Sequence, residues 1–323
     1  MAIYYLVPDN SKPSWGIGVI YYHVKALNDL GYEAYILHQK KGFQLPWLEV
    51  PVPIKYIDNH PPKAITADDV LVVPEVLAHE DFIQQYKARK ILFIQAAGWI
   101  FEKMPINKSH KHLGFSSVMV ILPHMIPIVE KFIKLPVFIV PPMLADYFFS
   151  SPIADKREKS IVMYPKFDQI DFSIVNGLLR RKIGNNKLKK ALGFDWRIKL
   201  LQGLTHQEVA ITFDKATFFI SLNTFEALNT SVVEAMARGC IVFCYEGFGP
   251  RDFLENEKNA FVFGNNEPYK LVEKVYDVLE HPEQYKIQLS EMRKQALNTA
   301  MQFAYSKMKA ELSINIKNLM ANS

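Results

Sequence analysis

The sequence of 323 residues lacks a hydrophobic run long enough to cross a membrane. A membrane-spanning helix needs about 20 predominantly apolar residues, and no window of this chain approaches that length. The first residues, MAIYYLVPDN, pass from Met1 directly into a strand-like segment without a basic lead or a cleavage site. We therefore expect a cytoplasmic protein.

Cysteine is nearly absent, and this limits the chemistry of the chain. The two cysteines, Cys240 and Cys244, lie in CIVFC, a segment typical of a buried strand. At about 3.3 Å per strand residue they stand about 13 Å apart, too far for a disulfide. No Cys or His pair with the spacing of zinc ligands accompanies them, and the nine histidines are scattered. We expect two inert core thiols and no metal site.

Charge of one sign is not in large excess. The formal net charge is +5 and the isoelectric point is about 8.9, with 49% hydrophobic and 22% charged residues. This composition excludes a disordered or fibrous chain and allows two globular domains. The mildly basic balance fits an anionic ligand or an anionic membrane surface. We expect no nucleic-acid partner.

The opening segment predicts a β-loop-α-β unit. Strands are expected from Ile3 to Pro8 and from Tyr35 to Leu37, with a helix of apolar period 3.6 from Ile17 to Leu30 between them. Gly16 and Gly18 stand directly before this helix, where a phosphate or sugar can approach the backbone. The third glycine of a dinucleotide fingerprint is missing. A ligand-binding role and a simple turn-forming role therefore both stay open.

Short apolar runs separated by helix-like stretches continue to about Pro142. Continuous apolar runs of this kind are typical of parallel strands that are covered on both faces. The sequence therefore predicts an open α/β sheet in the first half, with further strands at Val70–Pro74, Lys90–Gln95, Ser117–Leu122 and Val137–Val140.

The second half repeats this organisation after SSPIADKREKS, a polar stretch that predicts a linker. Its strands are expected at Ser160–Tyr164, 198–203, Thr217–Leu222, Ile241–Tyr245 and Ala260–Phe263, followed by helices from Pro268 onward. We predict two Rossmann-like α/β domains, residues 1–150 and 151–300, and a terminal helix, 301–323, that reaches back to the first domain. A cleft between such domains is a favoured ligand site.

The segment Phe225–Gly239, FEALNTSVVEAMARG, carries the chemistry best. Glu226 and Glu234 flank a small polar turn that opens into a short helix. The unpaired N–H groups and the positive dipole end of a helix start form an anion site. Ser231 and Glu234 also fit a capping box, so Glu234 has a purely structural alternative.

This segment and its extension, CIVFCYEGFGPRDFLENEKNAFVF, resemble the donor-binding signature of family 4 (group 1) nucleotide-sugar glycosyltransferases. That signature has Glu, seven residues, Glu, then Ala-Met-Ala-x-Gly. The match is tight from Thr217 to Phe263 and loose over most of the chain. The resemblance implies the GT-B architecture, with two Rossmann-like domains facing a central cleft. It also implies a metal-independent, retaining transfer of a hexosyl or related sugar in glycan assembly, such as polysaccharide biosynthesis, with a nucleotide diphosphate sugar as donor and no cofactor.

The resemblance also implies residue roles. Glu226 contacts the transferred sugar, Glu234 holds the ribose hydroxyls, and Lys166 neutralises the diphosphate. Preorganised amides, a helix dipole and a lysine stabilise a departing diphosphate without a metal. Glu226 and Lys166 are the expected catalytic residues, and the expected binding residues add Gly16, Gly18, Asn229, Thr230, Ser231, Val232 and Glu234.

Two departures from the family pattern affect this site. The first Glu is followed by Ala227-Leu228-Asn229 in place of Gly-Phe-Gly, and Asn tolerates a left-handed backbone better than most residues. Lys166 has no Arg before it, and Arg251 is the candidate replacement. On the acceptor side, Glu75 and His124 follow predicted strands and are weaker candidates.

Alternatives to a transferase stay open at this point. A nucleotide-sugar epimerase shares the architecture, and a catalytically degenerate GT-B partner subunit is compatible with the incomplete Arg-Lys pair. The acceptor can be a glycan, a lipid-linked molecule or a protein. Lys103, Lys108 and Lys111 follow Trp99 and Phe101, a mixture that suits peripheral docking on the inner face of a membrane and equally suits a solvated loop.

Overall fold

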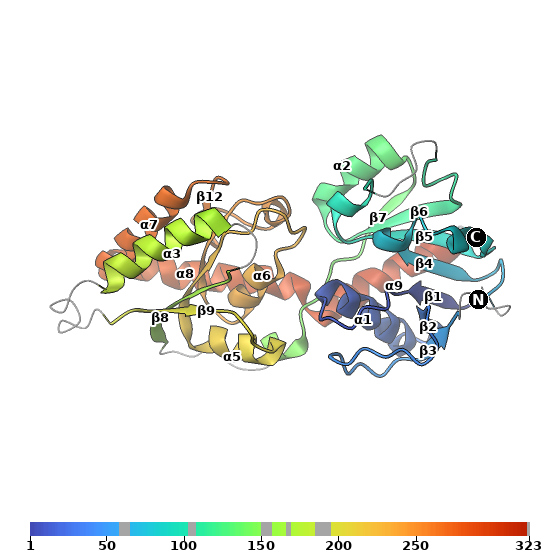
Figure 1. Cartoon of the computed structure of the whole chain (residues 1–323), viewed down its shortest axis with the longest axis horizontal. Coiled ribbons are helices and arrows are strands. Elements are labelled where there is room, and N and C mark those ends of the chain that lie inside the picture. Colours follow the sequence, from blue (N-terminus) through green and yellow to red (C-terminus); the bar gives the residue numbers. More distant parts are fainter. Residues whose placement is uncertain (58–64, 103–107, 150–156, 166–168, 185–194, 322–323) are drawn as a thin grey trace. The chain divides into compact units, whose positions relative to one another are not determined.

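The chain forms two compact units in the computed structural model, residues 1–143 with 306–323 and residues 144–305. The structure describes residues 1–57, 65–102, 108–149, 157–165, 169–184 and 195–321. Each unit contains one parallel sheet with helices around it (Figure 1). The predicted α/β class with two domains is confirmed. The first unit ends at Met143 rather than at residue 150, and the chain returns to it at Ser306.

The sheet of the first unit has the order β3-β2-β1-β4-β5-β6-β7, and all its strands are parallel. Successive strands are added on one side of β1 and then on the other. The loops that follow β1 and β4 therefore diverge, which is where open α/β sheets bind ligands. The strands are β1 (Ile3–Leu6), β2 (Ala34–His38), β3 (Ile54–Tyr56), β4 (Val70–Pro74), β5 (Arg89–Ile94), β6 (Phe115–Val120) and β7 (Val137–Ile139).

Strand β3 is absent from the sequence-based prediction. Its three residues are only half-buried, it lies at the edge of the sheet, and Pro51 and Pro53 precede it. Prolines next to a short, incompletely apolar run argue against a strand in the sequence. A strand at the edge of a sheet nevertheless tolerates them. The first helix, α1 (Trp15–Asp29), begins two residues earlier than predicted, so Gly16 and Gly18 lie inside its first turn.

The terminal helix α9 (Tyr305–Ala321) packs on the first unit from Ser306 onward, as the sequence predicts. Met308, Leu312 and Ile316 recur at helical spacing and are buried. The Asn315 amide donates to the carbonyl of Ile139 at 3.0 Å, which joins this helix to β7. Within its described residues the unit also contains α2 (Ile126–Ile128), which continues as a π-turn over Val129–Ile133.

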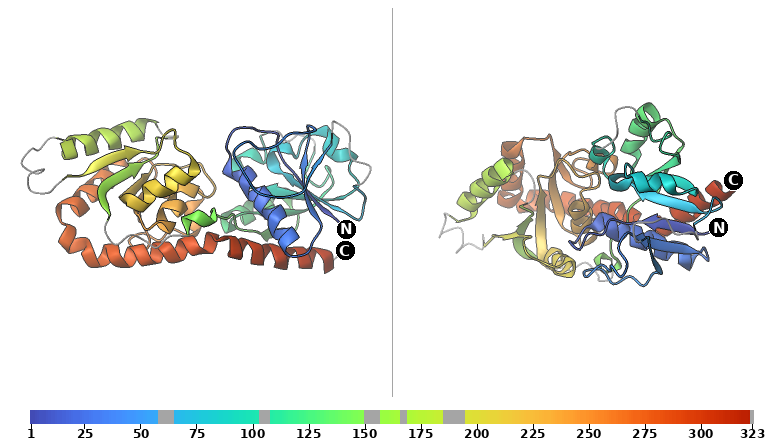
Figure 2. Two further views of the ribbon diagram at one scale, coloured as in Figure 1. Left: turned by 90° about the horizontal axis from the view of Figure 1, so that it is seen from below. Right: turned by 45° about the vertical axis from the view of Figure 1, so that its right-hand side comes forward.

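The second unit has a parallel sheet of order β12-β11-β10-β8-β9. Its strands are β8 (Glu158–Met163), β9 (Arg197–Leu200), β10 (Ala216–Ser221), β11 (Ile241–Tyr245) and β12 (Phe261–Phe263), and its helices are α3 (Gln169–Gly184), α5 (His206–Lys215), α6 (Thr230–Ala237), α7 (Pro268–Glu280) and α8 (Pro282–Ala300). Helices α3 and α7 contact each other, α5 contacts α6, and α6 contacts α8 (Figure 2).

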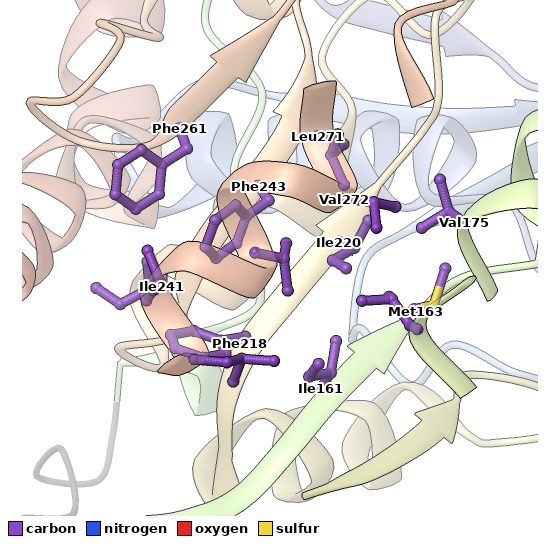
Figure 3. Close-up of a cluster of buried hydrophobic side chains, with 14 of the residues drawn as sticks. Ile161, Met163, Val175, Phe218, Ile220, Ile241, Phe243, Phe261, Leu271 and Val272 are labelled. Carbon is purple, nitrogen blue, oxygen red and sulfur yellow. The ribbon is translucent and has the colours of Figure 1, made fainter. Parts of the chain in front are cut away.

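Alternating side chains of β10 divide the core of this unit between the two faces of the sheet. Phe218 and Ile220 point into a cluster with side chains of α3 and α7, which Figure 3 shows. Phe219, one residue on, packs edge-to-face against Phe213 of α5, with ring centroids 5.0 Å apart. This is the period of two expected of a strand covered on both faces. Both sides of the sheet are therefore apolar.

The two cysteines lie in this core. Cys240 and Cys244 are free and fully buried, as predicted, and burial raises the pKa of each thiol to about 12. No helix in the described part of the chain is long and apolar enough to cross a membrane.

Candidate functional site

Two loops at the carboxyl edge of the second sheet are in direct contact. The loop after β10 turns at Asn223, whose side-chain oxygen accepts the N–H groups of Phe225 at 3.0 Å and Glu226 at 3.3 Å. The loop after β11 reaches it at Gly249, where an added Cβ would lie 1.4 Å from the carbonyl oxygen of Ala227. Only glycine permits this approach. The two loops together place Glu226 at the sheet edge.

Helix α6 begins at a residue with left-handed backbone. Asn229 has φ 54° and ψ 65°, and its amide donates to the Ser221 hydroxyl at 2.9 Å. The Ser231 hydroxyl donates to the side-chain oxygen of Asn229 at 3.1 Å. Asn adopts this conformation more readily than most residues, which explains how the chain turns here without the family's glycine. The side chain of Asn229 does not cap the helix.

The first turn of α6 keeps two open donors. The N–H of Val232 donates to the carbonyl of Asn229 at 3.0 Å, so this amide is already bonded within the turn. Within the described parts of the chain, the N–H groups of Thr230 and Ser231 have no acceptor. They point out of the helix start together with the positive end of its dipole. An anion is the natural partner for such a pair.

The capping-box alternative for Glu234 is wrong. Because α6 begins at Thr230, Glu234 is the fifth residue of the helix and lies too far along it to bond back to the cap. Its side chain, only 6% exposed, instead meets the Nε2 atom of His206, with 2.5 Å between Nε2 and Oε1. The Nδ1 atom of His206 lies 2.5 Å from the Tyr147 hydroxyl. We call this chain, Tyr147–His206–Glu234, the open relay, because its histidine is 32% exposed.

His206 and Tyr147 are absent from the residues predicted from the sequence. Helix α5 begins at His206, and Thr205 with Glu208 forms a full capping box, with 3.3 Å from the Glu208 N–H to the Thr205 hydroxyl and 2.7 Å from the Thr205 N–H to the Glu208 carboxylate. The letters THQE carry this signature, so the helix start was detectable. Tyr147 follows the first unit in sequence, and no local pattern marks it.

Lys166 and Arg251 are the two basic residues expected beside the diphosphate. Lys166 lies outside the described residues. Arg251 is tied to its own loop, where its guanidinium donates to the Gly247 carbonyl at 3.3 Å and lies 5.2 Å from the centre of the Phe248 ring.

The glycines of the first unit are packed against neighbours. The Gln95 amide donates to the carbonyl of Gly16 at 3.0 Å, and a Cβ at Gly16 would lie 3.2 Å from the Gln95 side-chain oxygen. A Cβ at Gly18 would lie 3.1 Å from the Trp15 ring. These contacts are enough to explain why small residues stand here. A ligand role for either glycine stays a prediction.

Glu75 is a buried carboxyl group at the carboxyl end of β4. It accepts the N–H of Ala96 at 2.9 Å and is 7% exposed. Burial raises the pKa of Glu75 to about 7, although hydrogen bonds from backbone N–H groups act in the opposite direction. A carboxyl group with such a pKa at a ligand-binding edge is a candidate functional residue. His124, the other weak candidate, lies in a turn after β6.

Metal ligation has no support in the described residues. They contain no group of three or more His, Cys, Asp or Glu side chains that could hold a metal ion.

Comparison with known proteins agrees with this geometry. Residues 182–297, which include α5, α6 and both loops of the site, match the model of the family described as glycosyl transferases group 1. A glycosyltransferase from Rickettsia africae has a similar structure, with a TM-score of 0.74 at 12% identity over 100% of this chain and 99% of that one. The fold is that of the GT-B glycosyltransferases.

Two further proteins are similar to this chain. Anabaena HepE, solved in complex with UDP, has a TM-score of 0.69 at 12% identity, covering 98% of this chain and 100% of that chain. An α-1,6-glucosyltransferase of Actinobacillus pleuropneumoniae serotype 7 (strain AP76) is 26% identical in an alignment of 260 residues that covers 73% of this chain and 69% of that protein.

Proposed function

We propose that this GT-B protein is a family 4 enzyme that transfers a hexosyl or related sugar from a nucleotide diphosphate sugar to a glycan acceptor. One observation carries the proposal. The start of α6, with open amides at Thr230 and Ser231, lies between Glu226 and Glu234 at the carboxyl edge of the second sheet. UDP in the HepE structure and the glucosyltransferase relative make UDP-glucose the first donor to test.

In the proposed mechanism the amides of Thr230 and Ser231, the α6 dipole and Lys166 hold the diphosphate. Glu226 orients the sugar and Glu234 accepts hydrogen bonds from the ribose hydroxyls. The bond from the sugar C1 to the diphosphate oxygen breaks while the acceptor oxygen bonds to C1 on the same face, so configuration is retained. The acceptor proton passes to the departing phosphate oxygen. Charge develops on the diphosphate, where the fixed donors stabilise it without a metal.

The cellular setting is also a proposal, a cytoplasmic enzyme of polysaccharide biosynthesis that docks on the inner face of a membrane. Three aromatic side chains of the first unit support docking, since Trp99, Phe101 and Phe132 are 50%, 46% and 62% exposed. The rings of Phe101 and Phe132 are 6.1 Å apart, and the Lys131 ammonium lies 5.5 Å from the centre of the Phe132 ring. Lys103 lies outside the described residues, and exposed lysines lie at positions 108, 111, 131 and 134.

This setting is testable with lipid vesicles. We expect the protein to sediment with phosphatidylglycerol vesicles and not with phosphatidylcholine vesicles, because lysines attract anionic headgroups and aromatic rings enter the interface. The double variant Trp99→Ser with Phe132→Ser is expected to stay in the supernatant. Equal sedimentation of both proteins would remove the docking surface from the proposal.

The transferase activity is tested with a panel of nucleotide sugars, each with and without candidate glycan acceptors. Release of nucleoside diphosphate that requires an acceptor is the expected result, and the anomeric proton signals of donor and product are expected to show retention. Glu226→Gln is expected to lower turnover at least about 100-fold. Glu246→Gln, an exposed carboxylate in the neighbouring loop, is the matched control and is expected to keep activity. Donor conversion without an acceptor would favour the epimerase.

The degenerate-partner alternative predicts a different result. A protein that binds none of the nucleoside diphosphates UDP, GDP and ADP in a calorimeter is not a donor-using enzyme. Binding without turnover on any donor, with Glu226→Gln indistinguishable from the original protein, would point to a subunit that has lost catalysis.

A further inference from the structure

The carboxylate of Glu234 is unusually constrained for a residue in the middle of a short helix. It is 6% exposed, and among the described residues its side chain bonds to the imidazole of His206 through Oε1. No described residue bonds to Oε2. One oxygen of the carboxylate is therefore anchored and the other keeps its lone pairs for a ligand.

The imidazole of His206 is itself anchored on three sides. Its Nδ1 atom meets the Tyr147 hydroxyl at 2.5 Å, and the rings of Tyr147 and Phe148 pack edge-to-face against it with centroid distances of 5.6 Å and 5.0 Å. Its backbone begins α5, which the capping box of Thr205 and Glu208 holds. The ring therefore has little freedom to turn.

The donors and acceptors of this relay fit only one neutral arrangement. A carboxylate accepts, so Nε2 of His206 carries the proton and donates to Glu234. Nδ1 is then an acceptor, and the Tyr147 hydroxyl donates to it. Each proton has one place, and the relay fixes the tautomer in the way that a partner on the second ring nitrogen does in metal and triad sites.

We propose that His206 is a positioning residue for nucleotide recognition, which fixes the Glu234 carboxylate so that Oε2 meets the ribose hydroxyls. This inference rests on the ribose role of Glu234 in the proposed function. Holding the carboxylate before the ligand arrives removes the ordering cost that a free side chain has on binding. Tyr147 acts one step further out by orienting the imidazole.

The test measures how strongly the protein distinguishes a ribose from a sugar without hydroxyls. Calorimetry compares UDP with 2′,3′-dideoxy-UDP, and GDP and ADP with their dideoxy forms, for the original protein and its variants. The original protein is expected to bind the ribose form at least about tenfold more tightly. In His206→Ala the ratio is expected to fall to within about threefold, with affinity for the dideoxy form almost unchanged.

Two variants separate positioning from damage to the fold. His206→Gln offers an amide donor to the same carboxylate and is expected to recover much of the ratio. Gln207→Ala changes an exposed side chain in the same turn of α5 and leaves the capping box in place, and its ratio is expected to equal that of the original protein. Thermal unfolding checks that each variant is folded.

The outcomes distinguish the inference from the function on which it rests. A His206→Ala protein whose ratio is unchanged or larger overturns the positioning role, since the histidine would then be neutral or would compete with the ribose. If the original protein binds nucleoside diphosphates without any preference for the ribose, the ribose role of Glu234 fails and this inference fails with it. If it binds none of them, the donor site itself is refuted.

Discussion

Both units contain a tyrosine–histidine–carboxylate chain, and the two chains differ in what they leave unused. In the first unit the Tyr21 hydroxyl lies 2.8 Å from Nε2 of His38, and Nδ1 of His38 lies 2.8 Å from Asp9. We call this chain the closed relay, because His38 is fully buried. In the open relay of the second unit, Tyr147–His206–Glu234, the histidine is 32% exposed.

The two carboxylates show the difference most clearly. Both oxygens of Asp9 are used, since Oδ1 also accepts from the N–H of Gln39 at 3.3 Å and Oδ2 accepts from that of Lys40 at 2.8 Å. The Glu234 carboxylate has a described partner on one oxygen only. A saturated, buried chain stabilises the loops after β1 and β2, whereas an unsaturated, partly exposed chain can bind. A tyrosine, a histidine and a carboxylate are therefore fully bonded to one another and to the backbone in the first unit, and we propose that the corresponding chain of the second unit serves recognition.

Removing the histidine of the closed relay is expected to have the largest effect. His38→Ala removes the ring that bonds both Tyr21 and Asp9 in a buried site and creates a cavity, so the free energy of unfolding is expected to fall by about 3–5 kcal/mol. His206→Ala is expected to cost at most about 1 kcal/mol, because its site is open to water. Urea denaturation of the two variants measures both values. Equal losses would mean that the relays do not differ as described.

The free energy of unfolding is expected to depend on pH through the buried carboxyl group of Glu75. Glu75 has a pKa of about 7 in the folded protein against an ordinary value of 4.5. Between these values the folded state holds a proton that the unfolded state has lost, so stability falls as pH rises and stays reduced above about 7. The full difference is about 3 kcal/mol.

Glu75→Gln removes this titration. The variant is expected to match the original protein in stability at pH 4 and to exceed it by about 3 kcal/mol at pH 8, as measured by urea denaturation at each pH. Parallel stability curves for the two proteins would show that Glu75 does not titrate in this range.

The contact between the two loops of the second unit is expected to depend on Gly249. Gly249→Ala places a Cβ 1.4 Å from the Ala227 carbonyl oxygen, so the loops must separate and Glu226 must move. We expect nucleoside diphosphate affinity to fall at least about tenfold and stability to fall by about 1–3 kcal/mol. Gly177 in α3 has no atom within 4 Å of an added Cβ, so Gly177→Ala is the matched control and is expected to be neutral or slightly stabilising. Normal binding by Gly249→Ala would contradict the packed loops.

Replacing the tyrosine of each relay by phenylalanine is expected to have the smallest effects on stability and on nucleotide binding. Tyr21→Phe leaves a buried imidazole nitrogen unpaired and is expected to cost about 1 kcal/mol of stability without changing nucleotide binding. Tyr147→Phe is expected to leave stability nearly unchanged and to lower the preference for ribose over dideoxyribose about two- to threefold. Thermal unfolding and calorimetry on both proteins check the pair. An effect of Tyr21→Phe on the ribose preference would remove the distinction between the relays.

The parts of the fold that sequence predicts best are those set by local pattern. Eleven strands of the described structure and the return of the terminal helix follow from short apolar runs and helical spacing, and the turn at Asn229 follows from the tolerance of Asn for a left-handed backbone. Strand β3 was not predicted because prolines precede it and its residues are only half-buried. It forms by pairing with β2, which the local sequence does not show. The start of α5 carries a capping-box signature in THQE, although the sequence-based prediction does not include this helix.

The open relay illustrates what a local pattern cannot reveal. Tyr147, His206 and Glu234 stand far apart in the sequence and meet only when α5 and α6 pack on the same sheet. In the sequence alone, Glu234 fits a capping box as well as a ligand site. Its helix starts at Thr230, and that register decides between the two.

The central claim is that the start of α6 binds the diphosphate of a nucleotide, and a titration followed by amide chemical shifts tests it most directly. Backbone amide spectra of the full chain are recorded with increasing UDP, GDP or ADP. We predict that the largest changes in chemical shift occur at the N–H groups of Thr230 and Ser231, with a smaller change at Val232, whose N–H is already bonded to Asn229. Changes confined to other parts of the chain, with the α6 amides unmoved at saturation, would contradict it.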